Sequence, residues 1–195
     1  MALLTRKSLD LGYEGEIIVK DLNFSVNEGD YVCVVGENGS GKTTLMRTLL
    51  GLIQPLGGQI VLGDGLSRTH IGYLPQSTAA QKDFPASVRE IVLSGCQGRC
   101  GMRPFYNKER VLLARALCAA RKLLLLDEPV TGLDPGAAEE MYQLIETLNK
   151  DEGLAIIMIS HDVDQAIGYA SHILHIGDEL FFGTKEVYEE RRRGQ

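Results

Sequence analysis

The sequence predicts an α/β fold in which helices flank a mostly parallel sheet and a small antiparallel β subdomain comes first. Two continuous apolar runs, at residues 122–126 and 154–159, have the composition of strands buried on both faces. Between them, residues 136–150 place apolar side chains at helical spacing. A strand, a helix and a second strand in this order form a right-handed crossover between parallel strands.

The remaining elements follow from shorter patterns. Residues 3–20 alternate apolar and polar side chains around a turn, Gly12-Tyr13-Glu14-Gly15, which predicts two antiparallel strands. Short strands are predicted at residues 60–62 and 70–74. An apolar strand at residues 31–35 is separated from a helix at residues 45–50 by a glycine-rich segment.

Size and charge restrict the function classes. The chain has 195 residues, enough for one α/β domain with a well-buried core. Its formal net charge of −6 disfavours a general nucleic-acid surface, so no nucleic-acid partner is expected. Neither a membrane span of about 20 apolar residues nor an apolar signal core is present. We therefore expect a soluble, cytoplasmic protein, with a solvated tail at residues 191–193.

The four cysteines show no zinc-binding pattern. Cys33 and Cys118 lie in apolar segments and are expected to be small buried hydrophobes. Cys96 and Cys100 are four positions apart, but no second Cys or His pair lies nearby at ligand spacing. A metal or redox role for this pair is the alternative.

The most informative motif is a glycine-rich run between a strand and a helix, which forms a phosphate-binding P-loop. Its residues are Gly36, Glu37, Asn38, Gly39, Ser40, Gly41, Lys42, Thr43 and Thr44. The glycines let backbone N–H groups surround a β-phosphate, and the helix N-terminus adds partial positive charge. Lys42 suits the β- and γ-phosphates, and the Thr43 hydroxyl suits Mg²⁺. The fold class is therefore a P-loop NTPase core; a chance glycine-rich turn is the alternative.

A pair of carboxylates, Asp127 and Glu128, follows the leucine-rich run. The pair stands at the C-terminal end of a predicted parallel strand, where ligands bind in such sheets. Asp127 would hold Mg²⁺, often through water, and Glu128 would polarise the water that attacks the γ-phosphate. Alone, such a pair is usually a solvated strand end. Together with the P-loop it predicts a phosphoryl-transfer site.

With these motifs the chain resembles the nucleotide-binding subunits of ATP-binding-cassette (ABC) transporters, over nearly its whole length. Residues 36–44 resemble the Walker A motif and residues 123–128 the Walker B motif. Residues 131–135 resemble the D-loop, Gln76 the Q-loop glutamine, and His161 the switch histidine. Tyr13 also resembles the aromatic residue that stacks on adenine.

The resemblance implies ATP and Mg²⁺ as ligands, with Glu128, His161 and Gln76 as catalytic residues. The implied metal site consists of Thr43, Gln76 and Asp127. Gln76 would reach the Mg²⁺ or the attacking water, and His161 would donate a hydrogen bond to the γ-phosphate. A capping or core role for His161 and an ordinary turn role for Tyr13 are the alternatives.

The resemblance also implies partners. The chain would lie at the inner face of the cell membrane, bound to an integral-membrane permease and indirectly to a substrate-binding protein. Family members form homodimers. Residues 84–92 resemble the region after the Q-loop in ATPases of zinc and manganese transporters, which implies metal-ion transport.

One expected motif is missing. The family signature, typically Leu-Ser-Gly-Gly-Gln, precedes an arginine-rich helix, here residues 110–117, but residues 103–109 do not match it. The interval between the Walker motifs is also short, which suggests an internal deletion. The chain would then be one nucleotide-binding domain, with residues 1–84 and 110–195 as the ATP-binding core and residues 85–109 as a remnant of the helical subdomain.

A similar run, Leu93-Ser94-Gly95-Cys96-Gln97, is followed by the helix breakers Gly98, Gly101 and Pro104, unlike a working signature. Without a signature, the alternatives to a transporter ATPase are a module that binds ATP but hydrolyses it inefficiently, and a soluble ABC protein with no permease.

Overall fold

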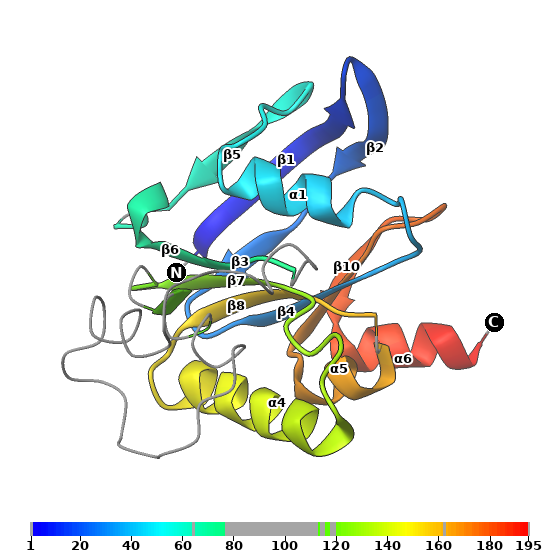
Figure 1. Cartoon of the computed structure of the whole chain (residues 1–195). Helices are drawn as coiled ribbons and strands as arrows, with labels where there is room; N and C mark the ends of the chain where they lie inside the picture. Colours follow the sequence, from blue (N-terminus) through cyan, green and yellow to red (C-terminus); the bar gives the residue numbers. More distant parts are fainter. Residues whose placement is uncertain are drawn as a thin grey trace.

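The computed structural model describes residues 2–63, 65–76, 113, 116–117, 120–161 and 163–194. Two sheets and four longer helices make up this part of the chain (Figure 1). The predictions for residues 84–92, 93–97 and 103–109 lie outside the described residues, as do those for Cys96, Cys100 and Cys118. Of the predicted helix at residues 110–117, the described Leu113, Ala116 and Leu117 are helical.

The N-terminal sheet is antiparallel, as predicted. It has the order β2-β1-β3, and β5 also pairs with β1. Its strands are β1 (Ala2–Tyr13), β2 (Glu16–Leu22), β3 (Ser25–Asn27) and β5 (Gly57–Leu62). The turn between β1 and β2 falls at Glu14 and Gly15, both with positive φ, so the glycine relieves strain there. The three-residue β3 was not predicted because it is too short to show a period.

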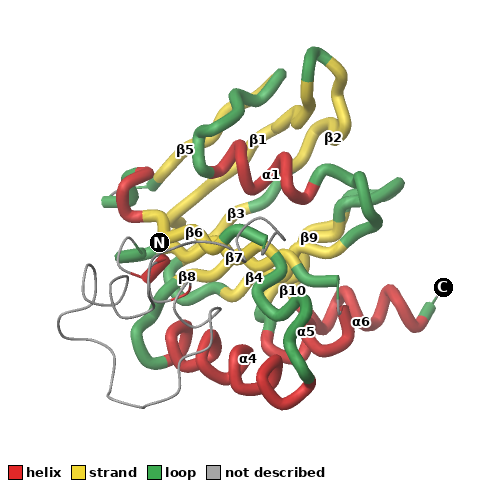
Figure 2. The backbone as a smooth tube through the Cα atoms, viewed as in Figure 1, coloured by secondary structure: helices red, strands yellow, loops and turns green. Residues whose placement is uncertain are grey.

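The second sheet has six strands in the order β10-β9-β4-β8-β7-β6 (Figure 2). All neighbours are parallel except β10 and β9. Its strands are β4 (Tyr31–Val35), β6 (Ile71–Leu74), β7 (Leu123–Asp127), β8 (Ala155–Ile159), β9 (His172–His175) and β10 (Phe181–Thr184). Every residue of β4, β7 and β8 is buried, as their continuous apolar runs predicted.

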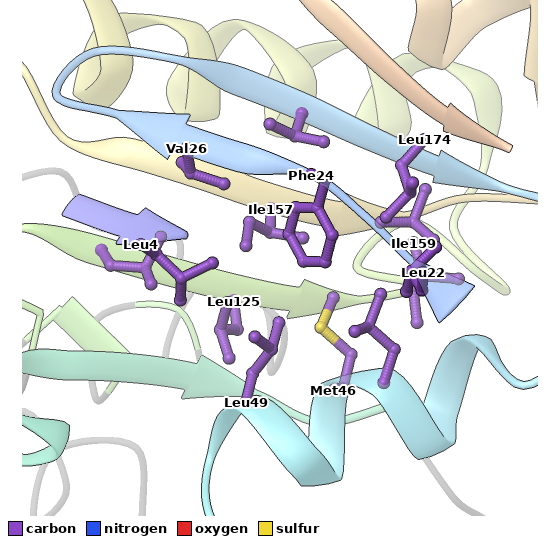
Figure 3. Close-up of a cluster of buried hydrophobic side chains, with 14 of the residues drawn as sticks. Leu4, Leu22, Phe24, Val26, Met46, Leu49, Leu125, Ile157, Ile159 and Leu174 are labelled. Atoms are coloured by element: carbon purple, nitrogen blue, oxygen red, sulfur yellow. The ribbon is translucent and has the colours of Figure 1, made fainter. Parts of the chain in front are cut away.

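Both faces of the six-stranded sheet are covered (Figure 1). On one face lie α1 (Lys42–Leu49) and the antiparallel sheet, and on the other lie α4 (Pro135–Lys150), α5 (Val163–Tyr169) and α6 (Lys185–Arg193) (Figure 1). Met46 and Leu49 of α1 point toward Leu125 and Ile157 in the first core (Figure 3). Burying each such side chain contributes about 1.5–3 kcal/mol, so this packing anchors α1, and the P-loop before it, to the sheet.

The second core holds α4 against the sheet. Met141, Tyr142 and Ile145 of α4 are buried with Leu124 and Ile156 of the central strands. The helix begins one residue earlier than predicted because Pro135 occupies its first turn and its fixed φ is already helical.

The arginine cluster at residues 191–193 corrects one expectation. It forms the last turn of α6 and is not a tail, although the three side chains are exposed. Arg191 pairs with Glu179, and Arg192 pairs with Asp164 at 2.8 Å. These cations also stand at the helix C-terminus, where the macrodipole favours positive charge. Residues 191–193 are therefore a helical turn whose exposed side chains include two ion-paired arginines.

Candidate functional site

Four segments carrying the predicted site residues leave the same edge of the parallel sheet. The P-loop follows β4, Asp127 ends β7 and Glu128 follows it. Gln76 lies two residues beyond β6, and His161 lies two residues beyond β8. Because β4, β8, β7 and β6 are adjacent and parallel, their C-terminal ends meet at one edge. The sheet therefore brings segments far apart in the sequence into one site.

The backbone of the P-loop depends on glycine. Gly36, Gly39 and Gly41 have φ values of 149°, 83° and 102°. A Cβ on Gly36 would lie 2.0 Å from the backbone oxygen of Ile176, in the segment after β9. Gly41 is the N-cap of α1, and no side chain caps this helix end. Its first-turn N–H groups therefore have no intrahelical acceptor and suit an anion.

Lys42 is buried beneath this loop. Its Nζ donates hydrogen bonds to the backbone oxygens of Gly36 at 2.7 Å and Glu37 at 2.6 Å. Burial lowers the pKa of Lys42, while the charges of Glu128 and Asp127 oppose this shift. The P-loop cation and the two predicted carboxylates are thus close enough to interact electrostatically.

Two buried oxygen atoms have no hydrogen-bond partner among the described residues: Ser40 Oγ in the P-loop and Asp127 Oδ1. Buried polar atoms normally have a partner, so such atoms require an explanation. Burial and the neighbouring Glu128 raise the pKa of Asp127. A hard divalent cation prefers oxygen ligands and would supply both a partner for Oδ1 and the missing positive charge. Asp127 therefore fits a Mg²⁺ site.

A tyrosine that the sequence reasoning missed also contacts Asp127. The Tyr73 hydroxyl in β6 donates to Asp127 Oδ2 at 3.5 Å. Burial and the nearby Asp127 raise the pKa of Tyr73 to about 12, so the phenol stays protonated and remains a donor. The prediction of β6 as a strand gave the position of Tyr73, but the strand register that places it beside Asp127 comes from tertiary pairing.

Glu128 contacts the other two predicted catalytic residues, Gln76 and His161. Gln76 Nε2 donates to Glu128 Oε2 at 2.5 Å, and His161 Nε2 lies 2.5 Å from Glu128 Oε1. Thr131, to which no catalytic role had been given, donates its hydroxyl to Oε2 at 3.2 Å. Glu128 has a left-handed φ of 52°, a conformation that non-glycine residues adopt at a cost and that often occurs at functional sites.

The other predicted residues have different surroundings. Tyr13 ends β1 and is 56% exposed, so its ring is accessible for stacking, and its adenine role stays a prediction. Thr43 is exposed in the first turn of α1. Asp134 of the D-loop caps α4, accepting hydrogen bonds from the N–H groups of Gly136 and Ala137 at 3.1 Å each.

Two concavities border these residues. One, of about 310 Å³, is lined by Glu128, Thr131 and His161 together with residues of α4 and α5. The other, of about 920 Å³, lies between P-loop residues 37–40, β2 and the segment around β10. The second has the size typical of small-molecule sites. Glu128 and the P-loop thus each border a concavity of the surface.

Comparison with known proteins decides the family. A family model described as ABC transporter matches residues 19–95. A zinc import ATP-binding protein, ZnuC, of Marinobacter nauticus is 34% identical, and the match covers 91% of this chain and 76% of that protein. The chain belongs to the ABC transporter family. A second ABC relative, the zinc import ATP-binding protein ZnuC of Ruegeria pomeroyi, is 31% identical over 95% of this chain and 79% of its own length.

Solved structures confirm the fold class. A nucleotide-free ATP-binding cassette from an ABC transporter aligns with a TM-score of 0.80 and 20% identity. The alignment covers 100% of this chain and 96% of that one. The α/β class with its N-terminal antiparallel subdomain is therefore the ABC cassette architecture. Members of this family are ATPases, as the resemblance implied.

The alignment with the Ruegeria relative also supports an internal shortening. It runs over 206 positions, more than the 195 residues of this chain, although only 95% of the chain takes part. The chain therefore has gaps where its ABC relative has residues. In the part of the chain that the structure describes, no helix has both the length and the apolar character needed to cross a membrane.

Proposed function

We propose that this ABC-family chain binds MgATP through residues 36–44 and hydrolyses it with Glu128 as the general base. One observation carries the proposal: Glu128 receives both Gln76 and His161 at the sheet edge that also presents Lys42 and Asp127. A metal ligand, a base, a phosphate-binding cation and an N–H donor loop are the parts that phosphoryl transfer uses.

In the proposed step, a water molecule attacks the γ-phosphorus. One of its protons passes to the Glu128 carboxylate while its oxygen forms the new bond to phosphorus. The bond from the γ-phosphorus to the bridging oxygen breaks, and its electron pair stays on ADP. Lys42 and the α1 N-terminus offset charge on the phosphates, and His161 donates to the γ-phosphate.

Mg²⁺ would be held by Asp127, Thr43 and Gln76, and it would supply positive charge that offsets the negative charge of the triphosphate. Asp127 presents the unpartnered Oδ1, and the Thr43 hydroxyl stands at the start of α1. In this proposal Tyr13 stacks on the adenine, for which its exposed ring is suited.

We further propose that hydrolysis drives metal-ion transport, such as that of zinc or manganese, through a membrane permease. The relatives from Marinobacter and Ruegeria bear the name zinc import ATP-binding protein, which supports this substrate class. The chain would then act on the inner face of the membrane as one nucleotide-binding domain, with residues 1–84 and 110–195 as its ATP-binding core. A substrate-binding protein would act only through the permease.

Three measurements test this proposal. Calorimetry should detect MgATP binding to the purified chain, and a radiolabelled assay should detect phosphate release that the Glu128→Gln variant lacks. For transport, the chain should restore zinc uptake to a strain that lacks its own zinc-import ATPase but retains the permease. ATP binding without restored uptake would leave the nucleotide site standing and remove the metal-transport assignment.

A second candidate function is a nucleotide-binding module that turns over ATP inefficiently. It is favoured by the absence of a signature motif in residues 103–109 and by the gaps against the Ruegeria relative. In that case calorimetry would detect binding, whereas steady-state turnover would be far below that of the full-length relative assayed in parallel.

A further inference from the structure

Three side chains share the Glu128 carboxylate, but only two have an expected partner on the nucleotide. Gln76 and Thr131 bond Oε2, and His161 bonds Oε1. In the proposed reaction Gln76 turns to Mg²⁺ or water and His161 to the γ-phosphate. When both leave, Thr131 is the one hydrogen-bonding side chain among the described residues that stays with Glu128.

Thr131 is held by the same turn as Glu128. Its backbone N–H donates to the backbone oxygen of Glu128 at 3.3 Å, and the N–H of Leu133 donates to the backbone oxygen of Val130 at 3.1 Å. The hydroxyl and the N–H of one residue therefore both bond Glu128. Glu128 has a left-handed φ at the start of this turn, and the Thr131 hydroxyl reaches back to its carboxylate.

We propose that Thr131 is a positioning residue for Glu128: its hydroxyl holds Oε2, so that Oε1 faces the attacking water. This inference rests on the proposed function. A glutamate has three rotatable bonds, and a base gives its full rate only when its reacting oxygen is held within hydrogen-bond reach of the water. A donor three residues away in a closed turn supplies that constraint without using a group that the nucleotide needs.

The surroundings of Thr131 make this role separable from folding. Its side chain is exposed and borders the concavity of about 310 Å³ together with Glu128 and His161. Valine has the same shape as threonine and lacks the hydroxyl, so Thr131→Val removes the hydrogen bond with little change in packing. Thr131→Ser keeps the hydroxyl.

The experiment measures MgATP affinity by calorimetry and single-turnover hydrolysis with enzyme in excess over radiolabelled ATP. We expect Thr131→Val to lower the rate constant about tenfold, part of the roughly 10²–10⁴ that a general base contributes, with affinity unchanged within about twofold. Thr131→Ser should recover the rate to within about threefold of the parent. Thr147→Val is the matched control, because Thr147 is also exposed and its hydroxyl donates to the Gln143 backbone oxygen in α4, away from Glu128.

A double variant tests whether the effect passes through Glu128. In a Glu128→Gln background, Thr131→Val should produce no further loss, whereas independent effects would multiply. A parental rate in Thr131→Val, an equal loss in Thr131→Ser, or a loss in affinity alone would overturn the positioning role. Equal rates for the parent and Glu128→Gln would instead remove the proposed base and, with it, this inference.

Discussion

At the scale of single residues, Lys42 is the most direct test of nucleotide binding. Its amine now bonds two loop carbonyls, and a triphosphate would replace these with charged oxygens. We expect Lys42→Ala to weaken MgATP binding roughly 10- to 100-fold, because hydrogen bonds to charged groups contribute about 1.5–3 kcal/mol. Calorimetry measures this. Lys150→Ala removes an exposed lysine whose ion pair, among the residues that the structure describes, is with Glu146, and it should leave affinity unchanged.

Glu128 should affect chemistry and not binding. Glu128→Gln keeps the size of the side chain and one acceptor oxygen, but it replaces the other oxygen with an NH2 donor and removes the ability to take a proton. We expect MgATP affinity within about threefold of the parent and a rate at least about 10²-fold lower. Glu146→Gln, a change at a partly exposed position of α4, serves as the control. Turnover of Glu128→Gln at the parental rate would place the base elsewhere.

The sequence predicted the residues that carry charge but not those that orient them. Asp127, Glu128 and Lys42 were recognisable because their types and spacing follow a motif. Thr131 and Tyr73 were missed because their roles come from contacts: one from a closed turn, the other from the pairing of β6 with β7. No local pattern encodes which oxygen a hydroxyl will reach.

At the scale of elements, the P-loop is fixed by a close approach between two chain segments. Gly36→Ala would combine positive φ with a Cβ that lies 2.0 Å from the Ile176 oxygen. Gly15→Ala has positive φ as well, but its Cβ would have no neighbour within 4 Å. The pair therefore separates backbone strain from steric clash.

We expect Gly15→Ala to lower the free energy of unfolding by about 1–2 kcal/mol, the cost of a left-handed residue. Gly36→Ala should cost roughly 1–3 kcal/mol more because overpacking adds to this strain. Urea denaturation followed by circular dichroism measures both. An equal loss of unfolding free energy in the two variants would show that the backbone at Ile176 moves away from the added Cβ at no measurable cost.

The long periodic elements and the short strands with apolar runs, β5 and β6, were predictable, whereas short strands without such a run were not. The β1–β2 hairpin, the buried strands β7 and β8, and α4 appear within a few residues of their predicted ranges. By contrast, β3 and β10 have three and four residues, and each depends on the strand beside it. Their positions follow from sheet pairing, which sequence periodicity does not contain.

At the scale of the whole molecule, the mismatch between residues 103–109 and the family signature predicts slow turnover and a monomeric chain. ABC subunits clamp each ATP between the P-loop of one copy and the signature of the other. A chain without the signature lacks the preorganised hydrogen-bond donors that this motif supplies to the phosphate. Its turnover should therefore be about 10²–10³ lower than that of the full-length Marinobacter relative. Steady-state phosphate release measures this, and light scattering with MgATP should show that Glu128→Gln stays monomeric.

Inserting the corresponding segment of the Marinobacter relative between residues 109 and 110 should raise both turnover and dimer formation. Vigorous turnover by the unaltered chain that Ser94→Arg abolishes would contradict the expectation. It would assign the signature role to residues 93–97.

The buried, unpartnered oxygen of Asp127 implies that this residue lowers the thermal stability of the folded protein while it serves nucleotide binding. Its pKa is raised in the folded protein, so the charged carboxylate opposes folding at pH values above its unfolded pKa, and this penalty fades as the pH falls. Asp127→Asn should therefore melt at a higher temperature than the parent at pH 7, by a margin that shrinks toward acid, while losing Mg²⁺-dependent nucleotide affinity. A melting temperature that is unchanged or lower would refute this. Laboratory evolution that selects only for thermal stability should replace this aspartate, whereas selection for ATP hydrolysis should keep it.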